Sequence, residues 1–224
     1  KAVYAGPAVD TMNITSFASG ELSFHGAGGD DTLNLPTSSD LIGRRVNFFG
    51  GAGTLNRITQ SSNTKSTPTT LHIFQNTIGA FPGDNFFAPG GSIYFESVQT
   101  MALRMGTGAD TAFIEPNPVA RVNLSADLPF LPGDQLNLAL AATINPVFSG
   151  SGNSGSMTSS NRATITYSGF EVGPTIDNVA PVVLSADINL DGAPGFALRL
   201  RRVVGLEIQR RDNAEHDGEN AADE

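Results

Sequence analysis

The chain has 224 residues, of which 39% are hydrophobic and none is Cys or Trp, so it can bury a core without disulfides or thiolate metal sites. Its formal net charge is −9, and six acids lie in residues 212–224, which leaves 16 acids against 13 Lys and Arg elsewhere. The lack of a basic stripe argues against nucleic-acid binding, and the lack of an 18-residue apolar run argues against a membrane span.

Short alternating runs follow one another along the chain, separated by turns rich in Gly and Pro. In one such run Met101, Leu103 and Met105 share a face. No run has the apolar spacing of an amphipathic helix, so the pattern predicts an all-β fold. We favour a parallel β-helix, a solenoid, and keep a β-sandwich as the alternative. The expected strands up to residue 178 are Thr11–Phe17, Glu21–Phe24, Thr32–Leu35, Arg45–Phe49, Leu71–Phe74, Ser92–Phe95, Met101–Met105, Ala112–Ile114, Arg121–Leu124, Gln135–Leu140 and Ala163–Tyr167.

Two segments, Ser61–Thr70 and Ser149–Ser160, are polar and lack apolar anchors, so we expect loops that project from the strands. Residues 1–178 are expected to form one repeat-built β domain. Residues 179–211 are expected to begin a further β unit or hairpin, with strands at Val182–Leu184, Phe196–Arg201 and Leu206–Gln209, and residues 212–224 form an acidic tail.

An internal repeat of about 75 residues is suggested by four landmarks that recur in the same order. If the repeat is structural, Val46 should superpose on Val122 and Gly83 on Gly133, with both Val side chains buried. The landmark pairs are Gly26–Leu33 with Gly106–Phe113, Arg45–Phe48 with Arg121–Leu124, Phe81–Phe86 with Leu131–Leu136, and Ser92–Glu96 with Thr164–Glu171.

The segment Gly26–Leu35 resembles the nonapeptide of haemolysin-type calcium-binding repeats, Gly-Gly-x-Gly-x-Asp followed by an apolar residue. In that family the ions lie between consecutive turns of a β-roll, whereas the copies here are isolated and incomplete. The order of the landmarks is similar to the degenerate β-helical repeats of very large bacterial surface proteins. That resemblance spans residues 10–175 as a pattern, and it implies export and a surface or matrix role without a reaction.

Calcium is the one cofactor that the residues suggest. Asp187, Asn189 and Asp191, followed by Gly192, match the first half of a calcium loop, although the position of the bidentate acid is not filled. The turn residues Asp30, Asp31 and Asp110 are further candidate ligands. The alternative for these three is that each side chain caps its own turn by accepting backbone N–H groups.

Catalytic patterns are missing from the sequence: His25, His72 and His216 lack the spacing of a zinc pair, and no nucleophile elbow is present. We therefore expect a non-enzymatic, secreted or cell-surface protein with a structural or adhesive role in a fibre, surface layer or adhesin stalk. Its expected partners are copies of itself. The alternatives are a calcium-dependent glycan-binding module and, third, a polysaccharide-active β-helix enzyme.

If Asp187, Asn189 and Asp191 bind calcium, a chelator should lower the melting temperature, because an ion that binds the folded state stabilises it. Differential scanning calorimetry with and without calcium measures the effect. An Asp191→Ala variant should lose the calcium response. A variant that melts and responds as the unsubstituted chain does would remove this site.

Overall fold

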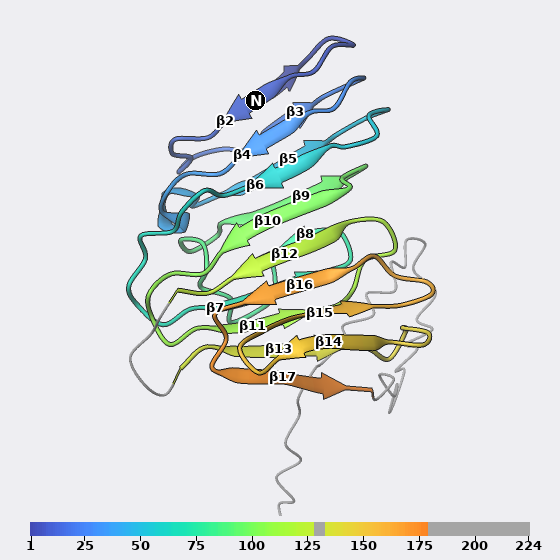
Figure 1. Ribbon diagram of the computed structural model, residues 1–224. Helices are drawn as coiled ribbons and strands as arrows, with labels where there is room; N and C mark the ends of the chain where they lie inside the picture. The colour runs from blue at the N-terminus through green and yellow to red at the C-terminus, as the bar shows by residue number, and fades with distance from the viewer. Residues whose placement is uncertain (128–132, 179–224) are drawn as a thin grey trace, which may run out of the picture. The chain divides into compact units, whose positions relative to one another are not determined.

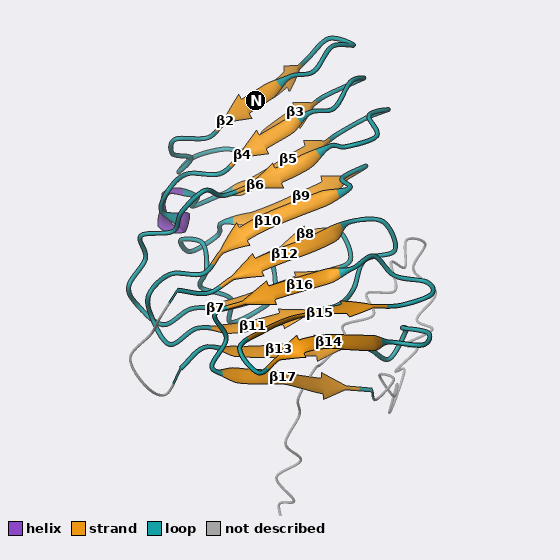
Figure 2. Ribbon diagram, viewed as in Figure 1, coloured by secondary structure: helices purple, strands orange, loops and turns teal. Residues whose placement is uncertain are grey.

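The computed structural model describes residues 1–127 and 133–178, and this part of the chain is all-β, as predicted. It contains 17 strands and one short 3-10 helix, η1 (Ser39–Leu41) (Figures 1 and 2). None of the described helical residues forms a segment long and apolar enough to cross a membrane. The predictions for 179–211 and 212–224, including Asp187, Asn189 and Asp191, fall outside the described residues.

The strands form two mixed sheets, which we call sheet A and sheet B. Sheet A has nine strands in the order β1 (Ala2–Tyr4), β3 (Leu22–His25), β5 (Arg45–Phe49), β9 (Ser92–Glu96), β8 (Thr77–Ile78), β7 (Thr70–Phe74), β11 (Thr111–Ile114), β13 (Gln135–Ala139) and β17 (Val172–Asp177). Sheet B has eight strands in the order β14 (Val147–Ser151), β15 (Ser154–Thr158), β16 (Ile165–Ser168), β12 (Arg121–Ser125), β10 (Thr100–Arg104), β6 (Arg57–Thr59), β4 (Thr32–Asn34) and β2 (Thr11–Asn13).

Most neighbouring strands are parallel, because the chain crosses between the sheets after nearly every strand (Figure 1). Thus β1, β3 and β5 add in turn to sheet A, while β2, β4 and β6 add to sheet B. Antiparallel pairing is confined to two places in the described residues. In sheet A, β8 pairs with both β7 and β9, and in sheet B the hairpin β14–β15 continues from β16.

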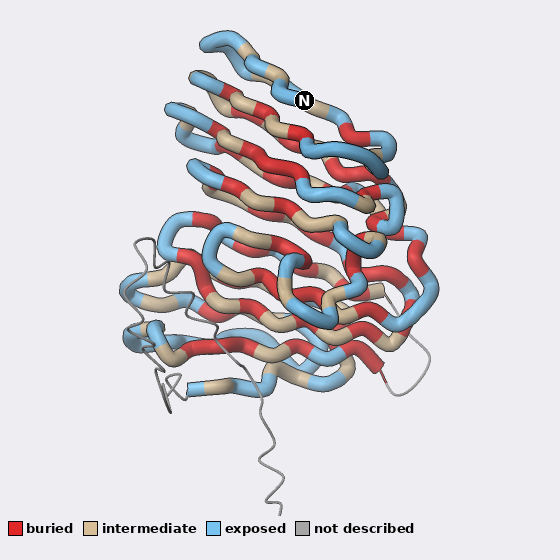
Figure 3. The backbone as a smooth tube through the Cα atoms, turned by 180° about the vertical axis from the view of Figure 1, so that it is seen from behind, coloured by how far each residue is buried: buried red, intermediate tan, exposed pale blue. Residues whose placement is uncertain are grey.

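The core lies between the sheets and is filled by alternate residues of most strands (Figure 3). In β9 the side chains of Ile93 and Phe95 are buried, whereas Tyr94 is half-buried and Glu96 is exposed. Parallel register places identical or similar side chains in columns: Phe24 pairs with Phe48, and their rings stack at 5.4 Å. In sheet B the column runs through Ile58, Met101, Val122 and Ile165.

Of the two segments expected as projecting loops, 61–69 contains no strand, as predicted, but carries buried side chains, and 149–160 forms strands instead. In 61–70 the side chains of Asn63, Lys65 and Thr69 are buried, and Lys65 Nζ lies 2.6 Å from Asp40 Oδ1. The segment 149–160 contains most of the hairpin β14–β15. Polar composition misled the prediction because Asn63 and Lys65 are buried with hydrogen-bond partners, and because the outermost strand β14 is wholly exposed.

The repeat of about 75 residues does not place equivalent residues in equivalent strands. Val46 lies in β5 of sheet A and Val122 in β12 of sheet B, although both are fully buried. The other two landmarks that include described strands also change sheet, from β4 to β11 and from β9 to β16. Gly83 and Gly133 share a positive φ, +96° and +94°, so the two glycines adopt the same local conformation. The similarity between the two segments of the chain therefore reflects turn residues and strand alternation, which are the same in both sheets.

Adjacent residues 48 and 49 allow a matched test of the two faces of β5. Phe48 is fully buried, so Phe48→Ala should lower the free energy of unfolding by about 3–5 kcal/mol. Phe49 is half-buried on the outer face, so Phe49→Ala should cost only about 1 kcal/mol. Urea denaturation followed by circular dichroism measures both. Equal losses would contradict the assignment of the two faces.

Candidate functional site

The residue just before each of four strands of sheet B forms a hydrogen-bonded column, which we call the amide column: Asp10, Asp31, Asn56 and Gln99. Each side chain after the first, Asp10, accepts the backbone N–H of the member on the preceding strand. The Asp10 N–H donates to Asp31 Oδ1 at 2.9 Å, the Asp31 N–H to Asn56 Oδ1 at 2.7 Å, and the Asn56 N–H to Gln99 Oε1 at 2.7 Å. The column satisfies N–H groups that the strand ladders leave unpaired at their starts.

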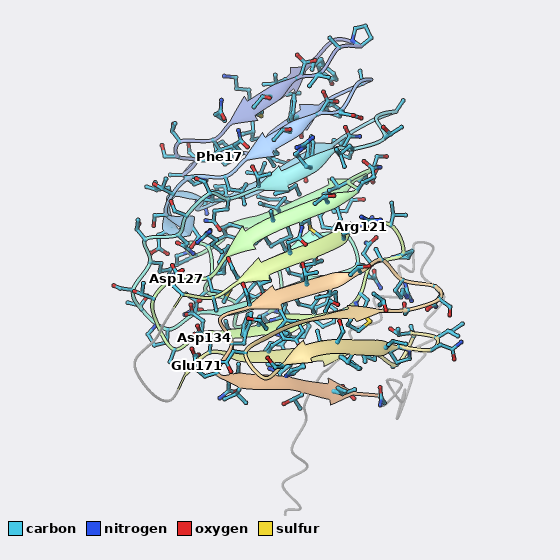
Figure 4. The ribbon with its side chains drawn as sticks, viewed as in Figure 1. Phe17, Arg121, Asp127, Asp134 and Glu171 are labelled. Atoms are coloured by element: carbon cyan, nitrogen blue, oxygen red, sulfur yellow. The ribbon has the colours of Figure 1, made fainter. Side chains whose placement is uncertain are left out.

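A second column, the acid column, occupies the same position in the part of sheet A from β7 to β17: Thr69, Asp110, Asp134 and Glu171. The Thr69 N–H and hydroxyl both donate to Asp110 Oδ1 at 2.7 Å. The Asp110 N–H donates to Asp134 Oδ1 at 2.7 Å, and the Asp134 N–H to Glu171 Oε2 at 2.8 Å. Asp134 and Glu171 lie beside each other where β13 and β17 begin (Figure 4).

The glycine-rich turn before β4 makes room for this arrangement. A Cβ on Gly26 would collide with the carboxyl group of Asp31. The glycines of this turn, which make it similar to a calcium-binding nonapeptide, can therefore be explained without an ion. They leave room for a buried carboxyl beside the backbone.

The three described calcium candidates are not brought together in one place. Asp31 and Asp110 belong to different columns, whereas Asp30 Oδ1 accepts the backbone N–H groups of Thr54 and Leu55, both at 2.8 Å. Asp30 and Asp31 cap a neighbouring strand or turn rather than their own, whereas Asp110 is bonded both to Thr69 and to the backbone of Gly106 in its own turn. Among the described residues, no three His, Cys, Asp or Glu side chains are grouped so as to hold a metal ion. Calcium at Asp30, Asp31 or Asp110 stays a prediction.

Burial sets the electrostatics of the columns. The side chains of Asp31, Asp110 and Asp134 have no exposed surface, and Oδ2 of each is buried without a hydrogen-bond partner. Desolvation raises the pKa of all three carboxyls. The pKa of Asp134 rises to about 7, chiefly through burial and then through the nearby charges of Asp110, Glu171 and Asp127. The pKa of Asp30 is lowered by its bonds to Leu55 and Thr54.

A stack of aromatic rings runs along the outer face of sheet A, one from each of the strands β1, β3, β5 and β9. Tyr4 stacks on His25 at 4.7 Å, His25 on Phe49 at 4.6 Å, and the edge of Phe49 meets Tyr94 at 6.0 Å. The guanidinium of Arg45 lies 5.0 Å from the centre of the Tyr94 ring. The inner rings cover each other's faces, whereas the outermost, Tyr4, is 76% exposed.

A second aromatic group surrounds His72, which lies on β7 and so also belongs to sheet A. Its Nδ1 lies 2.6 Å from Asp84 Oδ1, and its ring stacks on Phe113 at 4.4 Å and Phe81 at 4.5 Å. Asp84 also accepts the Phe81 N–H through Oδ2. The pair fastens the Pro-Gly turn at 82–83 to the strand, which is a structural role.

Two of the grooves on the described surface bear on function. A groove of about 290 Å³ on sheet B is lined by small and polar side chains, among them Ala102, Asn123 and Thr166. A groove of about 490 Å³ lies beside the turn after β9, and Glu96 is the one acid that lines it. Hydrolysis of a glycoside by the usual mechanism needs two carboxyl groups. The column acids Asp31, Asp110 and Asp134 are buried and line neither groove.

Comparison with known proteins adds no candidate function, because no protein-family model, curated protein or solved structure matches the chain.

Sequence reasoning missed Asn56, Gln99, Asp134 and Glu171. One signal was present: an acid directly precedes Thr at 10–11, 31–32 and 110–111, each time at the start of a strand. A search for a polar residue immediately before every expected strand would have found Asp10, Asp31 and Asp134, but not the members that precede strands expected one residue late or not expected at all.

Removal of one column side chain should be costly. Asn56→Ala leaves the buried Asp31 N–H without its acceptor and should lower the free energy of unfolding by about 1–3 kcal/mol. Asn34→Ala removes an amide on the outer face of sheet B and should cost at most about 0.5 kcal/mol. Urea denaturation compares them, and an equal effect would show that the column is not a special source of stability.

Proposed function

We propose that the chain is a structural or adhesive segment of an extracellular assembly, and that copies join through the ends of the two sheets. The observation that carries the proposal is the edge formed by β1 and β2. Each of these strands stands last in its sheet and is paired on one side in the described part of the chain. An unpaired edge presents backbone N–H and C=O groups to another strand.

The hydrogen bonds of β1 show which groups are free for this pairing. The Ser23 N–H donates to the Lys1 carbonyl, and the Ala5 N–H donates to the His25 carbonyl. In a parallel ladder alternate residues bond to the same neighbour, so Lys1, Val3 and Ala5 face β3. The backbone groups of Ala2 and Tyr4 consequently face the open side, next to the exposed face of the Tyr4 ring.

Strand direction favours head-to-tail addition. In sheet A, β17 runs parallel to β1, because the two antiparallel pairings at β8 cancel. In sheet B, β14 likewise runs in the direction of β2. A second copy placed with its β17 and β14 against β1 and β2 would extend both sheets as parallel sheets. Head-to-tail contacts of this kind build open filaments.

The same path of the chain supports a parallel β-helix over a β-sandwich as the finer description of the fold. Successive strands alternate between the sheets and stack with parallel neighbours, whereas strands of sandwiches are mainly antiparallel. Secretion or surface display belongs to the same proposal, and is supported by the resemblance of the landmarks to bacterial surface proteins.

A calcium-dependent glycan-binding module is the second candidate. The groove beside Glu96, Asn76 and Gln99 offers polar groups that could bond to sugar hydroxyls. The aromatic stack favours assembly instead, because stacked rings present their edges outward, and a sugar ring packs against an open aromatic face. Tyr4 has the most exposed ring of the stack, and it lies at the edge itself.

Proline substitutions separate the open side of β1 from its paired side. Ala2→Pro removes an N–H that faces away from β3, so it should reduce self-association while leaving the melting temperature nearly unchanged. Val3→Pro, the matched control, removes an N–H that faces β3 and should loosen β1 itself. Sedimentation velocity and small-angle scattering over a concentration series measure association.

The unsubstituted chain should form larger species as its concentration rises. A compact monomer at every concentration would reject assembly through this edge and leave the glycan-binding module as the leading function. If the Ala2→Pro variant associates as strongly as the unsubstituted chain, the contact lies on another surface.

A further inference from the structure

The acid column differs from the amide column in chemistry but not in geometry. Asn56 and Gln99 show that a neutral amide oxygen accepts the strand-start N–H as well as a carboxylate oxygen does. The acid column nevertheless uses Asp110, Asp134 and Glu171 on three consecutive strands. The hydrogen bonds alone therefore do not require three ionisable groups.

Asp134 is the central member, and its surroundings disfavour a negative charge. Its carboxyl has no exposed surface, Oδ1 accepts the Asp110 N–H, and Oδ2 is buried without a partner. Three acids face it: Asp110 before β11, Glu171 before β17 and Asp127 after β12. Two basic groups among the described residues act on its neighbours: Lys65 lies close to Asp110, and Arg104 lies 3.8 Å from Asp127.

We propose that the acid column is a proton-operated lock on strands β11, β13 and β17. With a proton on Asp134 the column is neutral at its centre, and the three strands are held in register by its side-chain bonds. Loss of this proton places a charge between Asp110 and Glu171 in a dry site, which loosens the end of sheet A that β17 forms. The lock needs no partner, so it is independent of the assembly proposed above.

The direction of the pH effect follows from the linkage of protonation to folding. The pKa of Asp134 is raised from an ordinary value near 3.8 to about 7 in the folded chain. Its contribution to stability is therefore fully present below pH 3.8 and is lost as the pH rises through 7. Between pH 5 and pH 7 the unfolding equilibrium constant should rise by nearly tenfold in the first pH unit and by less in the second, or about fiftyfold in all.

Urea denaturation of the full chain from pH 4 to pH 9 tests the lock with Asp134→Asn. The amide keeps an oxygen for the Asp110 N–H, as Asn56 does for Asp31, but it cannot ionise. The variant should lose most of the pH dependence between 5 and 8, and should be more stable than the unsubstituted chain at pH 8. A uniform loss of stability at every pH would show a merely structural role and overturn the proposal.

Asp30→Asn is the matched control, because Asp30 is half-buried rather than buried, and its pKa is lowered rather than raised. It should change stability without altering the transition between pH 5 and pH 8. Loss of that transition in the control would assign it to another group and overturn the lock.

Direct titration keeps the proposal testable if Asp134→Asn does not fold. Carbon-13 NMR of the aspartate carboxyl groups should show one that titrates above pH 6 in the unsubstituted chain. Glu171→Gln removes a neighbouring charge while keeping an acceptor for the Asp134 N–H, so this titration should move to lower pH. If every aspartate titrates below pH 5, no lock exists.

Discussion

Part of each sheet depends on one interaction: a side-chain oxygen at the start of a strand accepts the backbone N–H of the corresponding residue on the strand before it. At these points the chain leaves a turn, and the ladder has not yet supplied a partner. Asp31 and Asp110 fill the gap with their own buried side-chain oxygens. Because the side chain and the N–H must both fall at the first position, a shift of one residue in pairing would break the bond. The columns thus fix the register as well as satisfying the backbone.

Much of the fold followed from simple alternation. Arg45–Phe49 and Ser92–Phe95 were expected as strands because apolar residues recur at every second position, and the structure places strands there. Alternation was silent for Arg57–Thr59, which has a single apolar residue, and for Ser154–Thr158, in which Met157 is the one buried side chain. Neither strand has enough alternation of apolar and polar residues to be predicted from the sequence. Each is held by the strands that flank it.

The pairing of the strands could not be predicted from the sequence pattern. Residues joined by the column bonds lie 21, 25 and 43 residues apart in the amide column, and 41, 24 and 37 apart in the acid column. Because the hairpins at β8 and β15 lengthen some of these intervals, no constant period exists to be found. Sequence reasoning recognised Asp31 and Asp110 as special, since they follow glycine-rich turns. Their actual partners, Asp10 and Thr69, could be identified only in three dimensions.

The shortest strand divides sheet A mechanically. Strands β1, β3, β5 and β9 form one block and β7, β11, β13 and β17 another, and β8 joins them through the pairings of Thr77 and Ile78. Sheet B has no such seam at this level, because β6, β10 and β12 follow one another with parallel bonds. A tensile load applied across the strands would therefore open sheet A at β8 first. Sheet B would then stay intact and act as a hinge, so the two blocks of sheet A would swing apart before the molecule separated.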